Sequence, residues 1–388
     1  MNKNRNIYLL CVTAFLQGLV FYGPVATVYR QHRGISINDI FILETIFVIL
    51  MFIFEIPWGY LADRIGYKKT LIISFFIFFI SKIIFYLAHS FIGFLGEAIL
   101  IALAISGISG CDSALIYSSI DEKHSDKAFS YYNAAGTGGF LLAALVSTII
   151  LKYSLDLTAF LTIIPYGIAF FITFFLIDVD MKKNKEKSIK ILDSMKNLTK
   201  NKSIFIFVIA MALIGVSTHA LGVFLNQPLY SRSGISIRYF GIITALVQVA
   251  CLLSAKAYKL SEKVGSKKLY ITSILIIIFS SVLLIYSKKS LLVVLMIASM
   301  QGAFALCQPL AFTIQNKSIN TGDRVTLLST YAMIADVIAA FSNLLIGKAA
   351  EFSLKGGILM CVILELGALI LILIYFKKDK EYVLTLAR

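Results

Sequence analysis

Charged residues are scarce in this sequence. Of its 388 residues only 15% are Asp, Glu, Lys or Arg, whereas 59% are hydrophobic, and the mean hydropathy is +0.87. Soluble domains carry about 25% charged residues, so this composition excludes a soluble protein and places the chain in a membrane. The apolar stretches are about 20 residues long, which is the length of a membrane-spanning helix and about twice that of a barrel strand. We therefore predict an all-α integral membrane protein.

Cysteine pairs and catalytic motifs are also lacking. The five cysteines lie inside apolar runs, without paired or metal-binding spacings, and are predicted to be packing residues. The sequence contains no nucleotide-binding loop, metal-ligand cluster or catalytic triad, which argues against an ATP-driven pump and a membrane enzyme. We expect no metal and no cofactor. The run from Ile7 to Val28 is too long for a signal peptide and lacks a small-residue cleavage site, so it is predicted to be the first spanning helix.

The net charge of +15 has a topological explanation. About 25 of the 36 Lys and Arg fall in loops on one side of the predicted membrane, and positive residues accumulate on the cytoplasmic side. Both chain termini lie on that side. We therefore expect a chain partnered by the lipid bilayer and not by nucleic acid. Abundant Ile, Lys and Asn are typical of an AT-rich bacterial genome. We expect a multi-pass protein of the cytoplasmic membrane of a bacterium, and we expect it to be a monomer.

Twelve apolar runs, six and six, organise the sequence. The first six end near residue 178 and the second six begin near residue 203, with a lysine-rich polar segment between them. We predict an N-terminal six-helix bundle (1–178), a cytoplasmic basic linker (179–202) and a C-terminal six-helix bundle (203–388). The runs lie near residues 6–29, 39–62, 70–89, 92–119, 128–151, 158–178, 203–226, 237–259, 269–287, 291–314, 326–349 and 356–376.

An internal repeat supports this division. The segment Gly-Ile-Ser-Ile at 34–37 recurs at 234–237, in each half between the first and second runs. After the next run, residues 63–69 have a counterpart at 262–268, almost charge for charge. Two matches in the same order indicate two homologous six-helix halves in parallel orientation, and a site between such halves is typical of transporters.

The stretch 59–69, between the second and third runs, is the most informative part of the sequence. Its glycines at both ends permit close helix packing and a sharp reversal. Asp63 and Arg64 are placed to pair across the bend, and two lysines lie at headgroup level. The stretch closely resembles the loop signature of the major facilitator superfamily, with Tyr67 as a departure where that family usually has Arg or Lys. The residues that carry the match are Gly59, Leu61, Asp63, Arg64, Gly66, Lys68 and Lys69.

The resemblance implies twelve transmembrane helices in two pseudo-symmetric halves that work by alternating access. In that family the stretch is a gate element, in which Asp63 would cap a helix of the second half and pair with Arg64 while the transporter faces outward. A carboxylate near a helix N-terminus is physically sensible, because unsatisfied N–H groups and the positive end of the helix dipole lie there. The alternative is that Asp63 and Arg64 only hold the topology.

Ionisable residues inside the apolar runs are candidate functional groups, because each costs about 3 kcal/mol at membrane depth. Glu44 and Glu55 are close to three helical turns apart and share a helix face. Asp112 lies deeper, and a buried carboxyl group there would exchange protons and attract cations. The alternative for Glu55 and Asp112 is a structural hydrogen bond. The proton or substrate candidates are Glu44, Glu55, Glu97, Asp112 and Asp336.

Other residues of the apolar runs receive structural interpretations. Lys82 and Lys256 lie near helix ends and are predicted to snorkel. Glu97 is expected to pair with a polar neighbour in its own helix. The resemblance implies that runs three, six, nine and twelve lie outside the cavity, which places Lys82 and Glu365 on the outer set. Pro24 is expected to bend the first helix, as a hinge or as a packing kink.

Uncharged polar side chains favour the runs that the resemblance places around the cavity. Together with many Phe and Tyr, they would make a largely apolar site with a few hydrogen-bonding points, which suits lipophilic substrates better than sugars. His219 is interpreted as a packed polar residue in preference to a proton carrier. The cavity candidates are Gln17, Tyr22, His219, Asn226, Gln301 and Gln308.

The function that these features indicate is secondary active transport of a small-molecule substrate. We predict proton-coupled efflux of lipophilic or cationic compounds. Drug–proton antiporters of the superfamily usually carry an arginine in helix four and a proline-containing glycine pattern in helix five, whereas this chain has Glu97 and the proline-free glycines of 136–139. Proton-coupled uptake or facilitated diffusion of a small metabolite is therefore an alternative. A non-transporting membrane scaffold or sensor is a second alternative.

Overall fold

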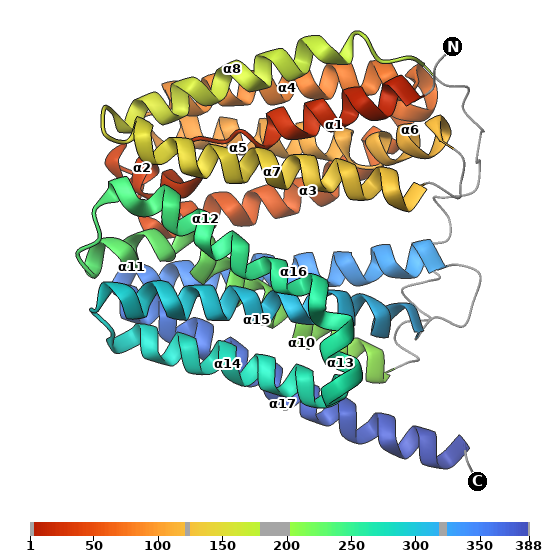
Figure 1. Cartoon of the computed structure of the whole chain (residues 1–388), viewed down its shortest axis with the longest axis vertical. Helices are drawn as coiled ribbons and strands as arrows, with labels where there is room; N and C mark the ends of the chain where they lie inside the picture. Colours follow the sequence, from red (N-terminus) through yellow and green to blue (C-terminus); the bar gives the residue numbers. More distant parts are fainter. Residues whose placement is uncertain (1–3, 121–124, 179–201, 318–323, 387–388) are drawn as a thin grey trace. The chain divides into compact units, whose positions relative to one another are not determined.

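The chain folds into helices joined by short connections. The computed structural model describes residues 4–120, 125–178, 202–317 and 324–386, and these ranges contain no strand (Figure 1). Within them, eleven helices are long and apolar enough to cross a membrane, and the shorter apolar helix 237–251 stands at the remaining position among the twelve predicted runs. The predicted all-α membrane fold is confirmed. Most of the predicted linker, 179–201, lies outside the described residues.

Two compact units make up the chain. Unit 1 falls within residues 1–183 and includes 236–245, whereas unit 2 falls within 184–235 and 246–388. The division into six-helix bundles at 179–202 stays a prediction. In unit 1, α1 packs against α7 and α8, while α4 packs against α5 and α8. The elements of unit 1 are α1 (Asn4–Gly18), η1 (Gly23–Val25), α2 (Ala26–His32), α3 (Ile37–Ile65), α4 (Tyr67–Leu87), α5 (Phe91–Ile108), α6 (Cys111–Ser119), α7 (Ser125–Ile150), α8 (Leu155–Thr173) and η4 (Ile237–Tyr239).

Unit 2 repeats this plan. Its α14 packs against α15 and α17, and its α10 packs against α16 and α17. The helix α12 (Phe240–Cys251) begins in unit 1 and ends in unit 2. The other elements of unit 2 are α10 (Lys202–His219), the π-helix η3 (Ala220–Phe224), α11 (Asn226–Arg232), η5 (Leu252–Lys256), α13 (Ala257–Val264), α14 (Ser266–Tyr286), α15 (Ser290–Lys317), α16 (Arg324–Phe352) and α17 (Leu354–Leu386).

Local chemistry explains where the helices begin and end. Ser36 caps α3, because its Oγ accepts from the Asp39 backbone N at 3.0 Å while Asp39 Oδ2 accepts from the Ser36 backbone N at 3.1 Å. Gly66 and Gly265 end α3 and α13 with φ of 93° and 89°, and the next helices, α4 and α14, each have 21 residues. The repeat found in the sequence is therefore also a repeat of helix boundaries.

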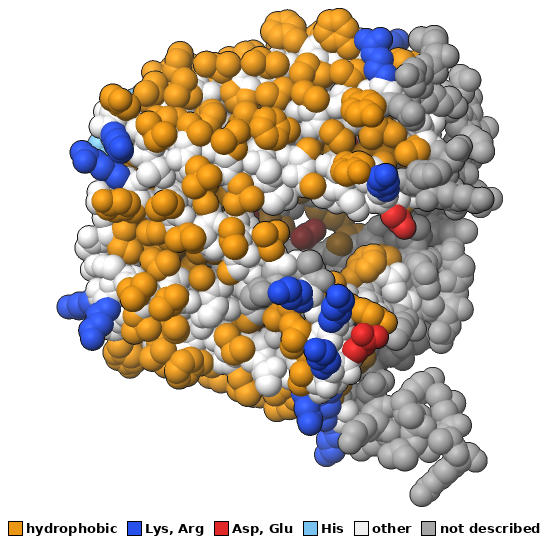
Figure 2. Space-filling model, viewed as in Figure 1, with side chains coloured by type: hydrophobic (Ala, Val, Ile, Leu, Met, Phe, Trp, Pro, Cys, Tyr) orange, Lys and Arg blue, Asp and Glu red, His pale blue; other side chains and the backbone are white. Residues whose placement is uncertain are grey.

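The surface of each unit suits contact with lipid. Figure 2 shows a face on which hydrophobic side chains predominate, with Lys and Arg toward its margins. Large apolar side chains such as Phe171 and Phe279 are 63% and 62% exposed. Within the helix bundles, by contrast, Ser and Thr hydroxyls such as those of Ser81 and Thr162 are buried and donate to carbonyls of their own helices. Apolar side chains therefore face outward as well as inward, and the buried hydroxyls are satisfied within their own helices.

Candidate functional site

Within the stretch 59–69, the chain reverses its direction at a single residue. Helix α3 continues to Ile65, Gly66 adopts a φ of 93°, and α4 begins at Tyr67. The predicted sharp reversal is confirmed at Gly66. The close packing predicted for Gly59 is wrong, because Gly59 lies inside α3 and a Cβ built on it meets no described atom within 4 Å.

Asp63 and Arg64 are both exposed at the end of α3. The Arg64 guanidinium lies 4.3 Å from the centroid of the Tyr60 ring, and the described residues show no ion pair between Asp63 and Arg64, so the predicted pairing across the bend is not formed here. The gate role stays a prediction. Among the remaining residues of the stretch, Leu61 and Lys68 are half-buried and Lys69 is exposed.

The first spanning helix is interrupted between α1 and η1. Residues 19–22 leave the helical path just before Pro24, as the sequence predicted. Two side chains of α8 satisfy the freed backbone groups: Tyr166 OH donates to the Gln17 carbonyl at 2.8 Å, and Thr162 Oγ1 accepts from the Phe21 N–H at 3.0 Å. The break is therefore stabilised by specific hydrogen bonds from α8.

Lys82 reaches this break from α4. Its Nζ donates to Tyr22 OH at 2.9 Å and lies 4.8 Å and 5.0 Å from the ring centroids of Phe78 and Tyr166. The residue is only 3% exposed. The prediction that Lys82 snorkels to the membrane surface is therefore wrong, because aromatic rings and the Tyr22 hydroxyl give its amino group a place inside the bundle.

Glu97 of α5 is buried in the same unit. Its Oε2 lies 3.4 Å from Arg30 Nη2, and the Arg30 guanidinium stands over the rings of Phe85 and Phe94. The partner of Glu97 is thus on α2, not in the fourth helix as predicted. A permanent cation thus compensates this carboxylate, which is only 1% exposed.

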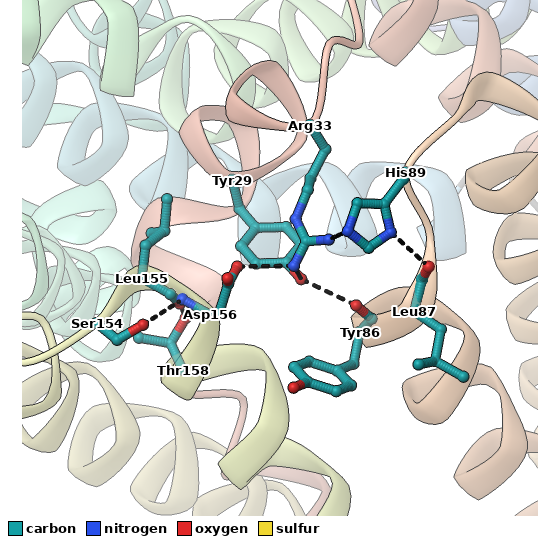
Figure 3. Close-up of polar contacts among 9 residues, drawn as sticks. All are labelled: Tyr29, Arg33, Tyr86, Leu87, His89, Ser154, Leu155, Asp156 and Thr158. Atoms are coloured by element: carbon teal, nitrogen blue, oxygen red, sulfur yellow. Dashed lines mark hydrogen bonds and ion pairs between the residues drawn. The ribbon is translucent and has the colours of Figure 1, made fainter.

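A polar network closes one end of unit 1 (Figure 3). Arg33 Nη2 donates to Asp156 Oδ1 at 2.8 Å and to Tyr29 OH at 3.1 Å, while its Nη1 contacts the Nε2 of His89. Tyr29 OH in turn donates to the Tyr86 carbonyl at 3.3 Å. Arg33 therefore ties together the C-terminal ends of α2 and α4 and the start of α8. Asp156 is about half exposed, so the ion pair is partly screened by water.

Asp112 lies in the first turn of α6, which begins after the chain turns at Gly110 with a φ of 83°. Its Oδ2 accepts from Tyr132 OH at 2.9 Å, and its Oδ1 accepts from the Ser113 backbone N–H. The other end of α6 is tied to α1, because Asn6 Nδ2 donates to Ser119 Oγ at 3.1 Å. Asp112 therefore lies in the part of the span nearer to Asn6 and less deep than expected. The carboxylate thus accepts two hydrogen bonds and lies near the positive end of the α6 dipole.

In unit 2 a π-helix takes the place of the break in unit 1. Asn226 Nδ2 donates to the Gly222 carbonyl at 2.6 Å, and Gln301 Nε2 of α15 donates to the Thr218 carbonyl at 2.8 Å. His219 is exposed and meets the Phe224 ring edge-on, with 5.3 Å between the ring centroids. The structure thus gathers His219, Asn226 and Gln301 around the π-turn.

The remaining candidates lie elsewhere on the helices. Glu44 is half-buried on α3, and Glu55 is exposed on the same helix. Asp336 and Gln308 are exposed on α16 and α15. Four residues that contact other helices through hydrogen bonds or ion pairs are not among the candidates predicted from the sequence. The sequence marks them only as polar groups in or beside apolar runs: Arg30, Tyr166, Thr162 and Ser281.

Comparison with known proteins identifies the family. A sequence profile of the Major Facilitator Superfamily matches residues 8–258 and 207–386. The chain belongs to the major facilitator superfamily. One relative is an uncharacterized MFS-type transporter of Methanocaldococcus jannaschii, which is 23% identical over 354 residues (87% of this chain, 90% of the relative). Another is the multidrug resistance protein MdtG of Escherichia coli, which is 27% identical over 288 residues (71% of this chain, 70% of the relative).

Solved structures share the major facilitator fold. The nucleoside transporter NupG superposes with a TM-score of 0.81 at 18% identity, covering 98% of this chain and all of that chain. A bacterial homologue of the human lysosomal transporter Spinster superposes with a TM-score of 0.74 at 14% identity, covering 97% and 98%. At these identities the likeness concerns the fold alone. This major facilitator superfamily protein is thus a multi-pass membrane transporter of small molecules and not an enzyme.

Proposed function

We propose that this transporter exports lipophilic, cationic small molecules in exchange for protons. It would do so by alternating access in the cytoplasmic membrane of a bacterium, with both termini inside. The observation that carries this proposal is the similarity to MdtG, a multidrug resistance protein, at 27% identity over 288 residues. Family and membrane location are established by the sequence profile, whereas substrate, direction and coupling are the proposal.

The geometry of unit 1 supports a cationic substrate at Asp112. Its carboxylate is half-buried, so it is desolvated enough to attract a cation and still accessible. Tyr132 and the start of α6 hold this carboxylate in place, where it would serve as the counter-charge of a bound cation. The region around Lys82 and Arg30 has the opposite character, since two cationic side chains accompany the single carboxylate of Glu97 there. A cation would therefore bind near Asp112 and avoid the break in α1.

Interruptions at equivalent places in the two units support alternating access. The break at 19–22 and the π-turn at 220–224 correspond under the offset of 200 residues that relates the segments 34–37 and 234–237. Each is held by side chains from a neighbouring helix, so the local backbone has a defined alternative to the regular helix. Irregular turns inside helices often mark hinges or functional sites, and discontinuous helices of transporters form substrate and ion sites.

The test uses purified protein in lipid vesicles, with ethidium as the lipophilic cation. We expect an inside-acid pH gradient to drive ethidium accumulation and nigericin, which collapses the gradient, to abolish it. Asp112→Asn should reduce accumulation by about tenfold, because a counter-charge for the bound cation is lost. The matched control is Asp126→Asn, an exposed acid on α7, which should behave like the wild type.

Other outcomes separate the alternatives. Solute uptake driven in the opposite direction, or equilibration without a pH gradient, would favour uptake or facilitated diffusion. Absence of any thermal stabilisation across dyes, antibiotics, peptides and sugars would favour a non-transporting protein, because a cavity ligand must stabilise the folded state it binds. Ethidium accumulation that ignores the pH gradient would contradict proton exchange.

A further inference from the structure

Glu365 is a fully buried acid at the centre of the span 354–377 in unit 2. Its exposure is 0%, as is that of Ser281 on α14. Ser281 Oγ donates to Glu365 Oε1 at 2.9 Å, and Glu365 Oε2 has no hydrogen-bond partner among the described residues. One carboxyl oxygen is therefore aimed into the bundle without any compensating group.

Among the described residues, no ion pair is formed with Glu365. From α14 it meets Ser281, whose Oγ also lies 3.7 Å from Met300 Sδ of α15. From its own helix the titratable neighbour is Cys361, one turn earlier and 0% exposed. Helices α10 and α16 also pack against α17. The Asp, Glu, Lys and His side chains described on these two helices are exposed, whereas Glu365 is fully buried: His219, Asp336, Lys348 and Glu351.

The equivalent place in unit 1 also holds an ionisable group. An offset of 199 residues relates Gly66 to Gly265 and the first residue of α8 to that of α17. The same offset relates Tyr166 to Glu365 and Lys82 to Ser281. In unit 1 the Lys82 Nζ lies 5.0 Å from the centroid of the Tyr166 ring. Both units thus bury an ionisable side chain where the third helix of the half meets the sixth, a base in one and an acid in the other.

The form of Glu365 that fits this place is the neutral acid. An ionised carboxylate in a dry interior needs a cation or several donors, and one serine hydroxyl does not replace them. Glu97 differs because it has Arg30, and Asp112 differs because it has Tyr132, the Ser113 N–H and a helix start. Among these three buried or half-buried acids, Glu365 alone lacks such compensation.

We infer that Glu365 is the proton-binding site of the transport cycle, carrying its proton in the conformation described here. The proton leaves when the packing of α17 against α14 loosens and admits water: the carboxyl O–H bond breaks, the proton passes to that water, and the carboxylate left behind is hydrated. Return of the packing requires protonation again. This inference rests on the proposed proton exchange and names the group that performs it.

The first experiment reads the protonation state directly. Infrared titration of the full chain in lipid vesicles should show the carbonyl band of a buried protonated carboxyl group, lost in Glu365→Gln and kept in Glu351→Gln, which changes an exposed acid of the same unit. A spectrum in which Glu365→Gln leaves this band intact, or in which the wild type has no such band at acid pH, would overturn the inference.

The second experiment measures coupling in vesicles with ethidium. Glu365→Gln, which mimics the protonated acid, should still equilibrate ethidium down its gradient but lose accumulation driven by a pH gradient by about tenfold or more. Glu365→Asp keeps a titratable group and should restore part of that accumulation, which a purely structural role would not predict. Wild-type coupling retained in Glu365→Gln overturns this inference alone, whereas a wild type without any gradient-driven accumulation overturns the proposed function.

Discussion

At the scale of single residues, the hydrogen bond between Lys82 and Tyr22 is expected to stabilise unit 1. Tyr22 OH is the acceptor that the structure gives to the buried Lys82 Nζ, at 2.9 Å. Tyr22→Phe removes this oxygen and leaves the amino group inside the bundle without it. We expect the free energy of unfolding to fall by roughly 1–3 kcal/mol, which chemical unfolding in mixed detergent micelles measures.

A double variant distinguishes this hydrogen bond from lost packing. Lys82→Met removes the buried amino group, so Tyr22→Phe should cost much less in that background than in the wild type. Tyr8→Phe is the matched control, because Tyr8 is 73% exposed and its hydroxyl reaches water. Equal losses from Tyr22→Phe in both backgrounds would show that the hydrogen bond contributes nothing.

Residue pairs mark the limit of what the sequence predicts. Ionisable groups in apolar runs identified Glu97 and Lys82 as unusual, but their partners Arg30 and Tyr22 lie 67 and 60 positions away. The spacing of residues along one helix does not predict how that helix is rotated relative to its neighbour. This rotation determines which side chains of the two helices are in contact. For the same reason the sequence predicts only that Glu365 lies on an outer helix, whereas in the structure Ser281 of α14 donates a hydrogen bond to it.

At the scale of helices, the two glycines of the stretch 59–69 have different physical roles. Gly66 holds a φ of 93° and a ψ of 154°, and a Cβ on it would lie 3.4 Å from Asp178 Oδ2. Gly66→Ala should therefore lower the free energy of unfolding by roughly 1–3 kcal/mol. Gly59→Ala should raise it by about 0.5–1 kcal/mol, because Gly59 is in a helix with open space at its Cβ.

Opposite signs for these two variants are the test, read from thermal unfolding of the purified proteins. Both substitutions add one methyl group to the same stretch, so each serves as the control for the other. Destabilisation by Gly59→Ala as large as that by Gly66→Ala would restore the close-packing role that the sequence suggested for Gly59.

Helix α7 approaches α1 through Gly139. A Cβ there would lie 2.1 Å from the Phe15 carbonyl oxygen, which is backbone and cannot rotate away. We expect Gly139→Ala to push the helices apart and lower the free energy of unfolding by roughly 1–3 kcal/mol. Gly138→Ala, whose Cβ meets no described atom within 4 Å, should leave stability unchanged or raise it by up to about 1 kcal/mol. Equal unfolding midpoints for the two variants would contradict this account.

Helix positions were the most predictable feature, and helix interruptions the least. Eleven of the twelve apolar runs recur as spans, and the twelfth as the shorter helix 237–251, because length and hydropathy determine which segments enter a bilayer. The interruption at Gly110 inside the run 92–119 was not foreseen, since hydropathy is blind to φ. It places Asp112 in the first turn of α6 and not in the middle of a helix.

At the scale of the whole molecule, the repeat carries over from sequence to structure with altered chemistry. Helices α4 and α14 have equal lengths and start after glycines with positive φ, yet the buried groups they present are Lys82 and Ser281. The two halves therefore keep a common backbone plan while their ionisable groups diverge. Under the proton-binding role inferred for Glu365, such divergence would let unit 2 respond to a proton through a group that unit 1 does not share.

Orientation in the membrane is the remaining whole-molecule prediction, and it rests on the distribution of Lys and Arg. Lys288 lies between α14 and α15 and Ser266 starts α14, so the two positions stand at opposite ends of one span, and both are exposed. With both termini inside, Lys288→Cys should react with a membrane-impermeant maleimide in intact cells, whereas Ser266→Cys should react only after permeabilisation. His89→Cys, exposed between α4 and α5, should follow Lys288→Cys, and the unaltered protein gives the background of its five native cysteines. The reverse labelling pattern would place both termini outside and would contradict the orientation predicted from Lys and Arg.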